Sequence, residues 1–165
     1  MTWTIRRAVS GDEAVLARIQ TESWKAAFCS IIPPELLAKC TDVERATAMY
    51  RRLLQENKGN GYILSVDEKP HCIAWWDAAR EENMTGFAEI ICIHSLKDNW
   101  RRGFGSRMMD RLLSDISASG FKKVMLWVFT ENERARRFYE ANGFHGTDRV
   151  QPAFSALEMC YERSL

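Results

Sequence analysis

Trp100-Arg101-Arg102-Gly103-Phe104-Gly105-Ser106 follows an apolar, strand-like run that begins at Ala88, and it leads directly into a helical pattern. The two glycines let the backbone turn tightly and approach a ligand, and the helix that starts there directs unpaired amide groups at the turn. This pattern predicts an anion-binding loop. It is neither a G-x-G-x-x-G dinucleotide turn, because Met108 replaces the third glycine, nor a Walker A loop, because no Gly-Lys-Ser/Thr follows.

A second motif follows the next apolar strand, Val124–Phe129, and reads N-x-x-A-x-x-F-Y-E-x-x-G-F from Asn132 to Phe144. Thr130 and Glu133 are spaced as a capping box, which places Asn132 in the first turn of a helix. The glycine turn and this motif together resemble the two central motifs of the GCN5-related N-acetyltransferases (GNAT).

The resemblance extends over most of the chain. Residues 4–8 followed by Gly11-Asp12 resemble the family's opening strand and helix start, and residues 23–28 followed by Ile31-Ile32-Pro33 resemble a first-helix signature of one bacterial subgroup. One position departs from the family pattern: its turn usually begins with Gln or Arg, and alignment of the glycines puts Trp100 there. The resemblance implies an α/β (α+β) GNAT fold, in which a mixed central sheet of about six to seven strands is flanked by about four helices and splits between its two central parallel strands.

The periodicity of the sequence agrees with this order of elements. Residues 3–8 suggest a strand. Ser10 and Glu13 are spaced as a capping box, which predicts a helix to about Ser23. After the interruption at Pro33-Pro34, Thr41 and Glu44 form a second capping box, which predicts another helix. Residues 62–66 and 71–77 predict a hairpin around Asp67-Glu68-Lys69. From Ala88 onward the pattern predicts a strand, a helix that ends near Gly120, a second strand and a second helix. Gln151-Pro152 separates a last strand pair, whose second member is 154–161.

Composition predicts one globular domain, residues 1–165. The chain is 46% hydrophobic and its net charge of +1 provides no bulk attraction to nucleic acid or membranes. Five cysteines without a C-x-x-C pair are typical of a reducing cytosol, and we find no signal or membrane-spanning run, so we expect a cytoplasmic protein. The three histidines lack metal-ligand spacing, so no metal is expected. A homodimer is compatible with these features.

The resemblance implies acetyl-CoA as acyl donor. Backbone groups of 93–95 would bind its pantetheine arm as an added strand does, and one N–H could polarise the thioester carbonyl. The amide side chain of Asn132 either forms a hydrogen bond to the pantetheine arm or diphosphate of the donor, or it serves only in the cap of its helix. Some of the arginines at 101, 102, 134, 136 and 137 would contact phosphates, and others would form solvated helix faces. The expected cofactor-binding residues are Ile93, His94, Ser95, Arg101, Arg102, Gly103, Phe104, Gly105, Ser106, Asn132 and Tyr139.

Three residues are candidates for proton transfer. The Tyr of F-Y-E lies near the thioester sulfur in the resembled family, so Tyr139 could protonate the leaving thiolate, or its ring could simply pack in the core. Glu89 lies where many family members place a catalytic Glu, and its alternative is a solvated strand-end carboxylate. His94 is the reserve base because its pKa needs no tuning. Cys92 near His94 suggests an acyl-enzyme, which we disfavour because neighbouring strand residues point to opposite faces.

The acceptor side is defined more weakly. Trp24, Phe28, Trp75 and Trp76 lie on elements that border the acceptor cleft in the resembled fold, and Trp75 and Trp76 must face opposite sides of their strand. The sequence therefore predicts an N-acetyltransferase that acts on a small-molecule or peptide amine by direct attack in a ternary complex. Two rivals are a non-catalytic acyl-CoA-binding or sensor module and a partner-interaction protein that retains only the scaffold.

Overall fold

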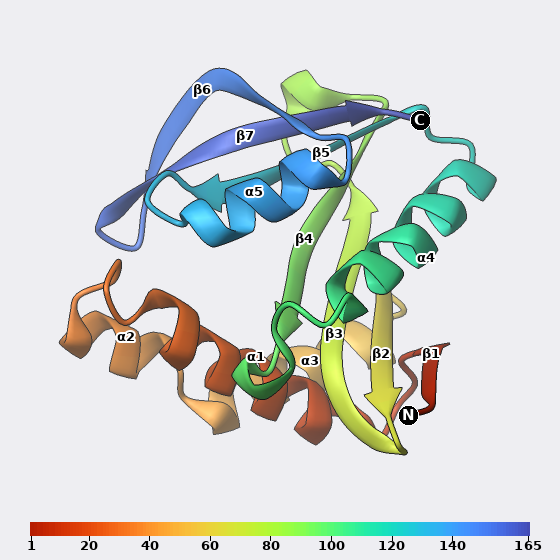
Figure 1. The fold of residues 1–165 in the computed structure, drawn as a ribbon, viewed down its shortest axis with the longest axis vertical. Coiled ribbons are helices and arrows are strands. Elements are labelled where there is room, and N and C mark those ends of the chain that lie inside the picture. Colours follow the sequence, from red (N-terminus) through yellow and green to blue (C-terminus); the bar gives the residue numbers. More distant parts are fainter.

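Seven strands form one mixed sheet in the order β1-β2-β3-β4-β5-β7-β6 in the computed structural model, which describes residues 1–165 (Figure 1). This confirms the expected sheet. The strands are β1 (Trp3–Arg7), β2 (Asn60–Val66), β3 (Lys69–Ala78), β4 (Phe87–Ser95), β5 (Lys123–Phe129), β6 (His145–Ala153) and β7 (Ala156–Ser164). The predicted hairpin is β2–β3, and its turn residues Asp67 and Glu68 both have positive φ, as a tight hairpin turn requires.

Five α-helices pack around this sheet, one more than expected. They are α1 (Glu13–Phe28), α2 (Pro34–Cys40), α3 (Val43–Gln55), α4 (Phe104–Ala118) and α5 (Glu133–Ala141), and two short 3₁₀ turns, η1 (Glu82–Met84) and η2 (Lys97–Asn99), precede β4 and α4. The additional helix is α2. Pro34 occupies its first turn, where the missing N–H of proline costs no hydrogen bond, so the two prolines start a helix there. No helix combines the length and the apolar character needed to cross a membrane.

The central pair, β4 and β5, is parallel and separates after a short contact. Residues 87–89 of β4 pair with 123–125 of β5, and no pairing continues beyond Glu89 and Met125. On its other side β4 pairs with β3 as far as Ser95, with a register irregularity between Trp75 and Trp76. The sheet therefore divides between β4 and β5, as predicted, and the divergence of the two strands is visible in Figure 1.

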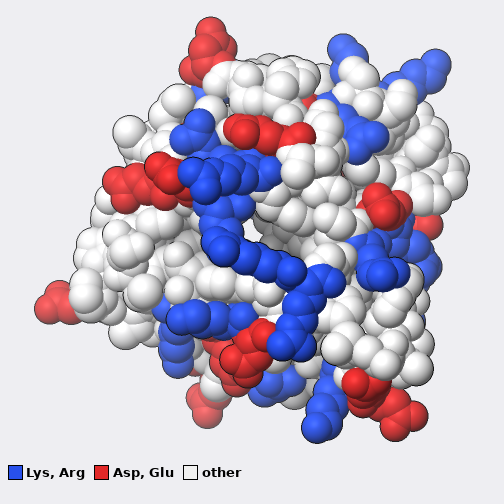
Figure 2. Space-filling view, in the orientation of Figure 1, with Lys and Arg blue, Asp and Glu red and all other residues white.

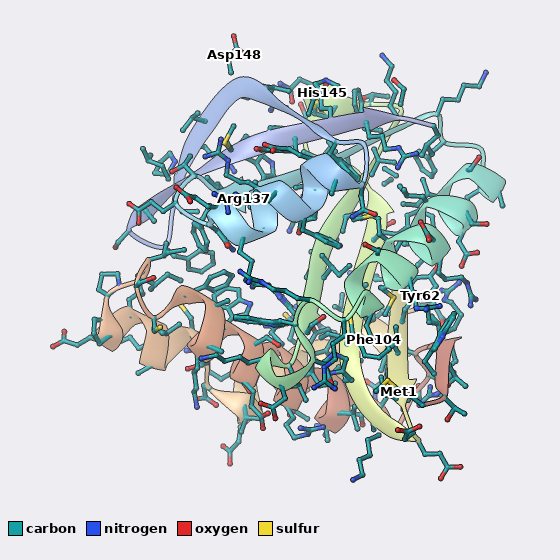
Figure 3. All side chains as sticks on the ribbon, in the orientation of Figure 1. Met1, Tyr62, Phe104, Arg137, His145 and Asp148 are labelled. Carbon is teal, nitrogen blue, oxygen red and sulfur yellow. The ribbon has the colours of Figure 1, made fainter.

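The two faces of the sheet carry separate cores. The larger core lies between the sheet and α4, and includes Tyr62 and Phe104, both labelled in Figure 3. The second core joins the opposite face to α1 and α3. Trp76 belongs to the first and Trp75 to the second. The prediction that these adjacent residues face opposite sides is therefore correct, because side chains alternate along a strand.

The predicted caps of α1 and α3 are wrong in detail. In α3 the cap is Asp42, whose carboxylate accepts hydrogen bonds from the amides of Glu44 and Arg45 at 3.0 and 3.1 Å. The Thr41 hydroxyl instead donates to the carbonyl of Leu37 at the end of α2. A residue can satisfy the end of one helix or the start of the next, and the closely spaced helices use the two neighbours for the two tasks.

The first helix also differs from the expectation, since α1 runs from Glu13 to Phe28 and does not stop near Ser23. Ser10 makes no cap. Asp12 precedes the helix and forms an ion pair with Arg6 at 2.7 Å. The longer helix matters for the site, because its last two turns carry aromatic side chains toward the opening between β4 and β5.

The last two strands meet at Phe154-Ser155 and not at Gln151-Pro152. Both turn residues have positive φ, and β6 continues through Pro152 to Ala153. Proline is tolerated there because β6 is the edge strand of the sheet, where a missing N–H breaks no inner ladder.

Candidate active site

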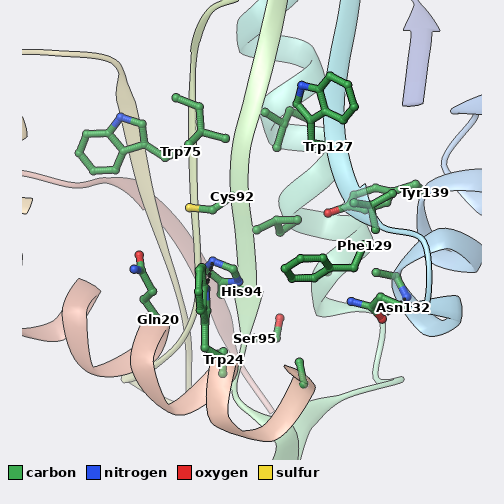
Figure 4. Close-up of a pocket in the computed structure, with 18 of the residues that line it drawn as sticks. Gln20, Trp24, Trp75, Cys92, His94, Ser95, Trp127, Phe129, Asn132 and Tyr139 are labelled. Atoms are coloured by element: carbon green, nitrogen blue, oxygen red, sulfur yellow. Dashed lines mark hydrogen bonds between the residues drawn. The ribbon is translucent and has the colours of Figure 1, made fainter. Parts of the chain in front are cut away.

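A cavity of about 1740 Å³ lies where β4 and β5 separate (Figure 4). Its walls come from α1, α3, β4, β5, the turn before α4 and the first turns of α5. Most of the residues predicted as functional line it: Trp24, Phe28, Trp75, Glu89, Ile93, His94, Ser95, Arg101, Gly103, Gly105, Ser106, Asn132 and Tyr139. Phe104 and Trp76 are buried in the core beside α4, and Arg102 is exposed outside the cavity.

The glycine turn presents an uncapped helix end to this cavity. Gly103 stands at the N-cap of α4 with φ +82°, and no side chain caps the first turn. A Cβ at Gly103 would meet no other atom, whereas a Cβ at Gly105 would lie 3.1 Å from the Phe138 ring of α5. The left-handed conformation favours glycine at position 103. At position 105 an added Cβ would fit only if the Phe138 ring shifts slightly. The free amides and the helix dipole suit a bound anion, so this end of the cavity fits a diphosphate.

Asn132 is itself the N-cap of α5, which corrects its predicted place inside the first turn. Its side-chain oxygen accepts a hydrogen bond from the Ala135 amide at 3.2 Å, and its NH₂ group has no partner in the protein. The Thr130 hydroxyl donates to the carbonyl of Leu157 and takes no part in the cap. The helix-cap interpretation is therefore confirmed, and the NH₂ group of Asn132 remains free of protein partners on the cavity wall.

The hydroxyl of Tyr139 points toward β4 (Figure 4). The ring is 9% exposed and packs against Phe138, Phe144 and Tyr161, and the hydroxyl makes no hydrogen bond to the protein. Burial raises the pKa of Tyr139, so the phenol keeps its proton at neutral pH. Tyr139 is therefore a protonated phenol that core packing holds at the cavity wall.

Glu89 is buried, so the alternative interpretation of it as a solvated carboxylate at a strand end is wrong. It is 2% exposed, and it accepts three hydrogen bonds from Arg80: from the backbone amide at 3.2 Å and from the guanidinium at 3.1 and 2.7 Å. A carboxylate offers about four lone-pair sites, so about one remains for another donor. Arg80 lies in the segment that joins β3 to β4, and it was not among the predicted site residues.

The pKa of His94 is shifted from its ordinary value, contrary to the expectation from the sequence. Burial lowers the pKa of its ring to about 4. The indole N–H of Trp24 donates to Nε2 of His94 at 3.2 Å, and the two rings meet edge-on in Figure 4. His94 is therefore neutral at physiological pH, and its one ring-nitrogen lone pair, on Nε2, already accepts a hydrogen bond.

Cys92 lies on the same face of β4 as His94, which corrects the argument made against an acyl-enzyme. The two residues are two positions apart, pair with Trp75 and Ile73 of β3, and both point to the α1 side of the strand (Figure 4). A different property disfavours a thiolate nucleophile: burial raises the pKa of the Cys92 thiol to about 12.

Aromatic side chains form the wall near α1. Trp24 contacts Phe28 and Phe154, each with 5.2 Å between ring centroids, and Phe28 contacts Phe129 at 5.0 Å. Phe129 and Phe154 come from β5 and the β6–β7 turn, and no local pattern assigned them to this wall. Trp75 is fixed by close packing, since a Cβ on Gly61 would lie 2.3 Å from its ring.

A further pair missed from the sequence stands between the glycine turn and α5. The guanidinium carbon of Arg134 lies 3.6 Å from the centre of the Trp100 ring, and the indole N–H of Trp100 donates to the carbonyl of Ser95 at 2.9 Å. The unusual Trp at position 100 was the one signal for this contact. Its partner lies on another element and could not be assigned.

A family model described as "Acetyltransferase (GNAT) family" matches residues 31–144 of this chain. A Bacillus subtilis (strain 168) protein called "Uncharacterized N-acetyltransferase YuaI" is 24% identical over 140 residues, which are 84% of this chain and 78% of that protein.

Solved structures show the same fold. PaiA N-acetyltransferase from Thermoplasma acidophilum, in complex with coenzyme A, is similar with a TM-score of 0.85 at 17% identity over 100% of both chains. A GCN5-related N-acetyltransferase from Rhodopseudomonas palustris is similar with a TM-score of 0.77 at 18% identity over 100% of this chain and 97% of that one. The split sheet, the glycine turn and the matched family model agree, and the chain belongs to the GNAT family of acetyltransferases.

Proposed function

We propose that this protein transfers an acetyl group from acetyl-CoA to a primary amine by direct attack within a ternary complex. The observation that carries the proposal is the opening between β4 and β5, because it places the uncapped start of α4, the amide of Asn132 and the free hydroxyl of Tyr139 around one cavity. The similar Thermoplasma acidophilum structure holds coenzyme A, which supports this choice of donor.

Different residues of the cavity would bind different parts of acetyl-CoA. The first-turn amides of α4 would bind phosphate oxygens, and the edge of β4 at 93–95, which has no strand partner on the β5 side, would bind the amides of the pantetheine arm. The Asn132 NH₂ group, which has no protein partner, would donate to the same arm. These contacts would hold the thioester between the strands, where the acceptor amine can approach its carbonyl carbon.

Tyr139 would act as the general acid. The amine nitrogen forms a bond to the carbonyl carbon, the carbon–sulfur bond breaks, and the thiolate takes the phenolic proton. The raised pKa of Tyr139 keeps that proton in place before the reaction, and the absence of a protein partner leaves it free to move to the sulfur.

The proton of the amine must also leave, since an alkylamine has a pKa near ~10.4. We assign this step to Glu89, with His94 as the alternative. The observation that favours Glu89 is the Trp24 hydrogen bond, which occupies Nε2 of His94, whereas Glu89 keeps one lone-pair site beside the cavity. The lowered pKa of His94 also makes that ring a weak base at neutral pH.

Two measurements test the function. Calorimetric titration with acetyl-CoA should show saturable binding, and a thiol-release screen across amino acids, polyamines, aminoglycosides and peptide N-termini should identify an acceptor. Binding without turnover on any amine would favour the non-catalytic acyl-CoA-binding module. Absence of binding would favour a scaffold that only contacts protein partners.

A further inference from the structure

A group of uncharged hydrogen-bonding side chains lies on the α1 side of the cavity. Gln20 and Ser23 are three positions apart on α1, so they share one face of the helix, and both line the cavity together with His94 of β4. Figure 4 shows Gln20 on the same side of β4 as His94. None of these side chains has a part in the contacts proposed for acetyl-CoA.

The hydroxyl of Ser23 is a buried polar group without a partner. Ser23 is 3% exposed, and its Oγ makes no hydrogen bond in the protein. A hydroxyl in a helix can donate to the carbonyl four residues earlier, as Thr21 does to Ala17 at 2.9 Å on the same helix. An unpaired buried hydroxyl destabilises the protein, so its presence on a cavity wall indicates a partner that arrives with a ligand.

Gln20 and His94 each present an unused N–H group as well. The hydroxyl of Tyr50 on α3 donates to Oε1 of Gln20, which leaves the NH₂ group of this amide without a protein partner. Nε2 of His94 accepts from Trp24, so the ring proton lies on Nδ1, and this N–H donates to no protein group. Together with the Ser23 hydroxyl, these groups offer three donors to a ligand.

These donors carry no positive charge, in contrast to other parts of the cavity. A row of Lys and Arg side chains crosses the hollow of the molecule in Figure 2, and Arg101 and Arg134 line the cavity from the glycine turn and α5. Burial alone lowers the pKa of His94, and no neighbouring charge shifts it. Arg52 and Lys58, near the end of α3, are exposed to solvent. An anion bound at the three donors would therefore lose its hydration without gaining a counter-charge.

We propose that Gln20, Ser23 and His94 bind uncharged amide carbonyl oxygens of the acceptor, and that the acceptor is the amino terminus of a peptide. The inference rests on the proposed function, because it assumes that an amine enters this cavity to reach acetyl-CoA. Carbonyl oxygens suit the site, since they accept hydrogen bonds without bringing a charge. The aromatic wall beside α1, which includes Trp24 and Phe28, would pack against apolar side chains of the same peptide.

The first test compares three acceptors in the thiol-release assay at saturating acetyl-CoA. Alanyl-phenylalaninamide has an amine, amide carbonyls and an aromatic ring, alanyl-phenylalanine ends in a carboxylate, and 4-phenylbutylamine has the amine and the ring but no carbonyl. The kcat/KM should be highest for the amide and lower by roughly tenfold or more for the alkylamine, which leaves the donors unpaired. Equal use of the alkylamine, or a preference for the free acid, would overturn the proposal.

Ser23→Ala should reduce this preference without harming the fold. Because the hydroxyl has no partner in the protein, its removal should leave the urea midpoint of unfolding unchanged or raise it. The kcat/KM for the amide should fall roughly three- to tenfold, the loss expected for one hydrogen bond, and that for 4-phenylbutylamine should not change. Gln20→Glu keeps an oxygen that accepts from Tyr50 and removes the NH₂ donor, so it should also lower the ratio of amide to alkylamine. An unchanged ratio in both variants would show that neither side chain contacts the acceptor.

Thr21→Val is the matched control. It removes a hydroxyl from the same helix, but Thr21 does not line the cavity and its hydroxyl already donates to Ala17. The ratio of kcat/KM for the amide and the alkylamine should equal that of wild type. An equal fall of this ratio in Thr21→Val and Ser23→Ala would assign the effect to a disturbed α1 and would also overturn the proposal.

Two further results separate this proposal from the proposed function. If wild type binds acetyl-CoA and acetylates only amines without a carbonyl, such as polyamines, the assignment of a peptide acceptor is wrong and acetyl transfer stands. If wild type acetylates no amine, the proposed function is wrong, and the assignment of the acceptor is wrong with it.

Discussion

The indole N–H of Trp24 donates a 3.2 Å hydrogen bond to Nε2 of His94, although the residues are 70 positions apart in the chain. An indole nitrogen can only donate, so Nε2 must carry the lone pair and the ring proton must sit on Nδ1. One contact thereby fixes the tautomer and the neutral charge of a histidine in the cavity wall. Burial acts in the same direction, lowering the pKa of His94 to about 4.

This lowered pKa predicts an acid-sensitive stability. The unfolded chain takes up a proton on His94 near its ordinary pKa of 6.5, whereas the folded protein does so only near 4. The contribution of the neutral ring to the free energy of unfolding is therefore complete above about pH 6.5, and it is lost as the pH falls toward 4. Urea unfolding at pH 7 and pH 5 should show a smaller loss in His94→Gln than in wild type.

His145→Gln is the control for that experiment, because His145 is exposed on β6. It should lose stability between the two pH values as wild type does. Part of the loss should remain in every variant, since burial also lowers the pKa of His71. An identical loss in wild type and His94→Gln would contradict the assignment.

Tyr139→Phe should separate binding from chemistry. The substitution keeps the packed ring and removes only the hydroxyl, which has no partner in the protein. With an acceptor identified, kcat should fall roughly 10²-fold or more, as for loss of a general acid, while the Kd of acetyl-CoA barely changes. Normal turnover would mean that water or another group protonates the thiolate.

Glu89→Gln should lower kcat/KM and remove the rising limb of its pH profile if Glu89 takes the proton of the amine. Glutamine keeps the shape of the side chain, but it can accept hydrogen bonds from Arg80 on one atom only and it cannot take up that proton. His94→Gln should leave the limb in place. A limb that survives in Glu89→Gln and vanishes in His94→Gln would transfer the role of base to His94.

The Glu89 variant needs its own control, because it also breaks the ion pair with Arg80 at 2.7 Å. Arg80→Gln breaks the same pair and keeps the carboxylate. It should be destabilised like Glu89→Gln and yet retain the pH limb. If both variants lose the limb, the effect comes from disturbed packing and not from a missing base.

Gly105→Glu should abolish acetyl-CoA binding, because a carboxylate in the first turn of α4 would repel the diphosphate at the helix start. Gly105→Ala provides the comparison: its Cβ would lie 3.1 Å from the Phe138 ring, so the ring must shift slightly. The alanine variant should retain most of the affinity measured by calorimetry, with circular dichroism confirming that both variants fold. Tight binding by the glutamate variant would remove the phosphate from this turn.

Much of the backbone follows from the sequence alone. The alternation of strand side chains places Trp75 and Trp76 on opposite faces, and the glycine at 103 marks the left-handed turn before α4. The hairpin turn at Asp67-Glu68 and the order of elements around the split were likewise predictable. These features depend on periodicity and on the sterics of neighbouring residues, which any short stretch of chain already contains.

The pairing of side chains across elements depended on the tertiary structure. His94 contacts Trp24, and Trp100 contacts Arg134, only because separate strands and helices meet at the opening between β4 and β5. Glu89 contacts Arg80 because the antiparallel pairing of β3 and β4 brings the segment that follows β3 beside β4. These contacts determine which groups are charged, which are neutral and which donors are free. Hydrogen bonds and charges act over a few ångströms in space, and the sequence specifies that proximity only through the whole fold.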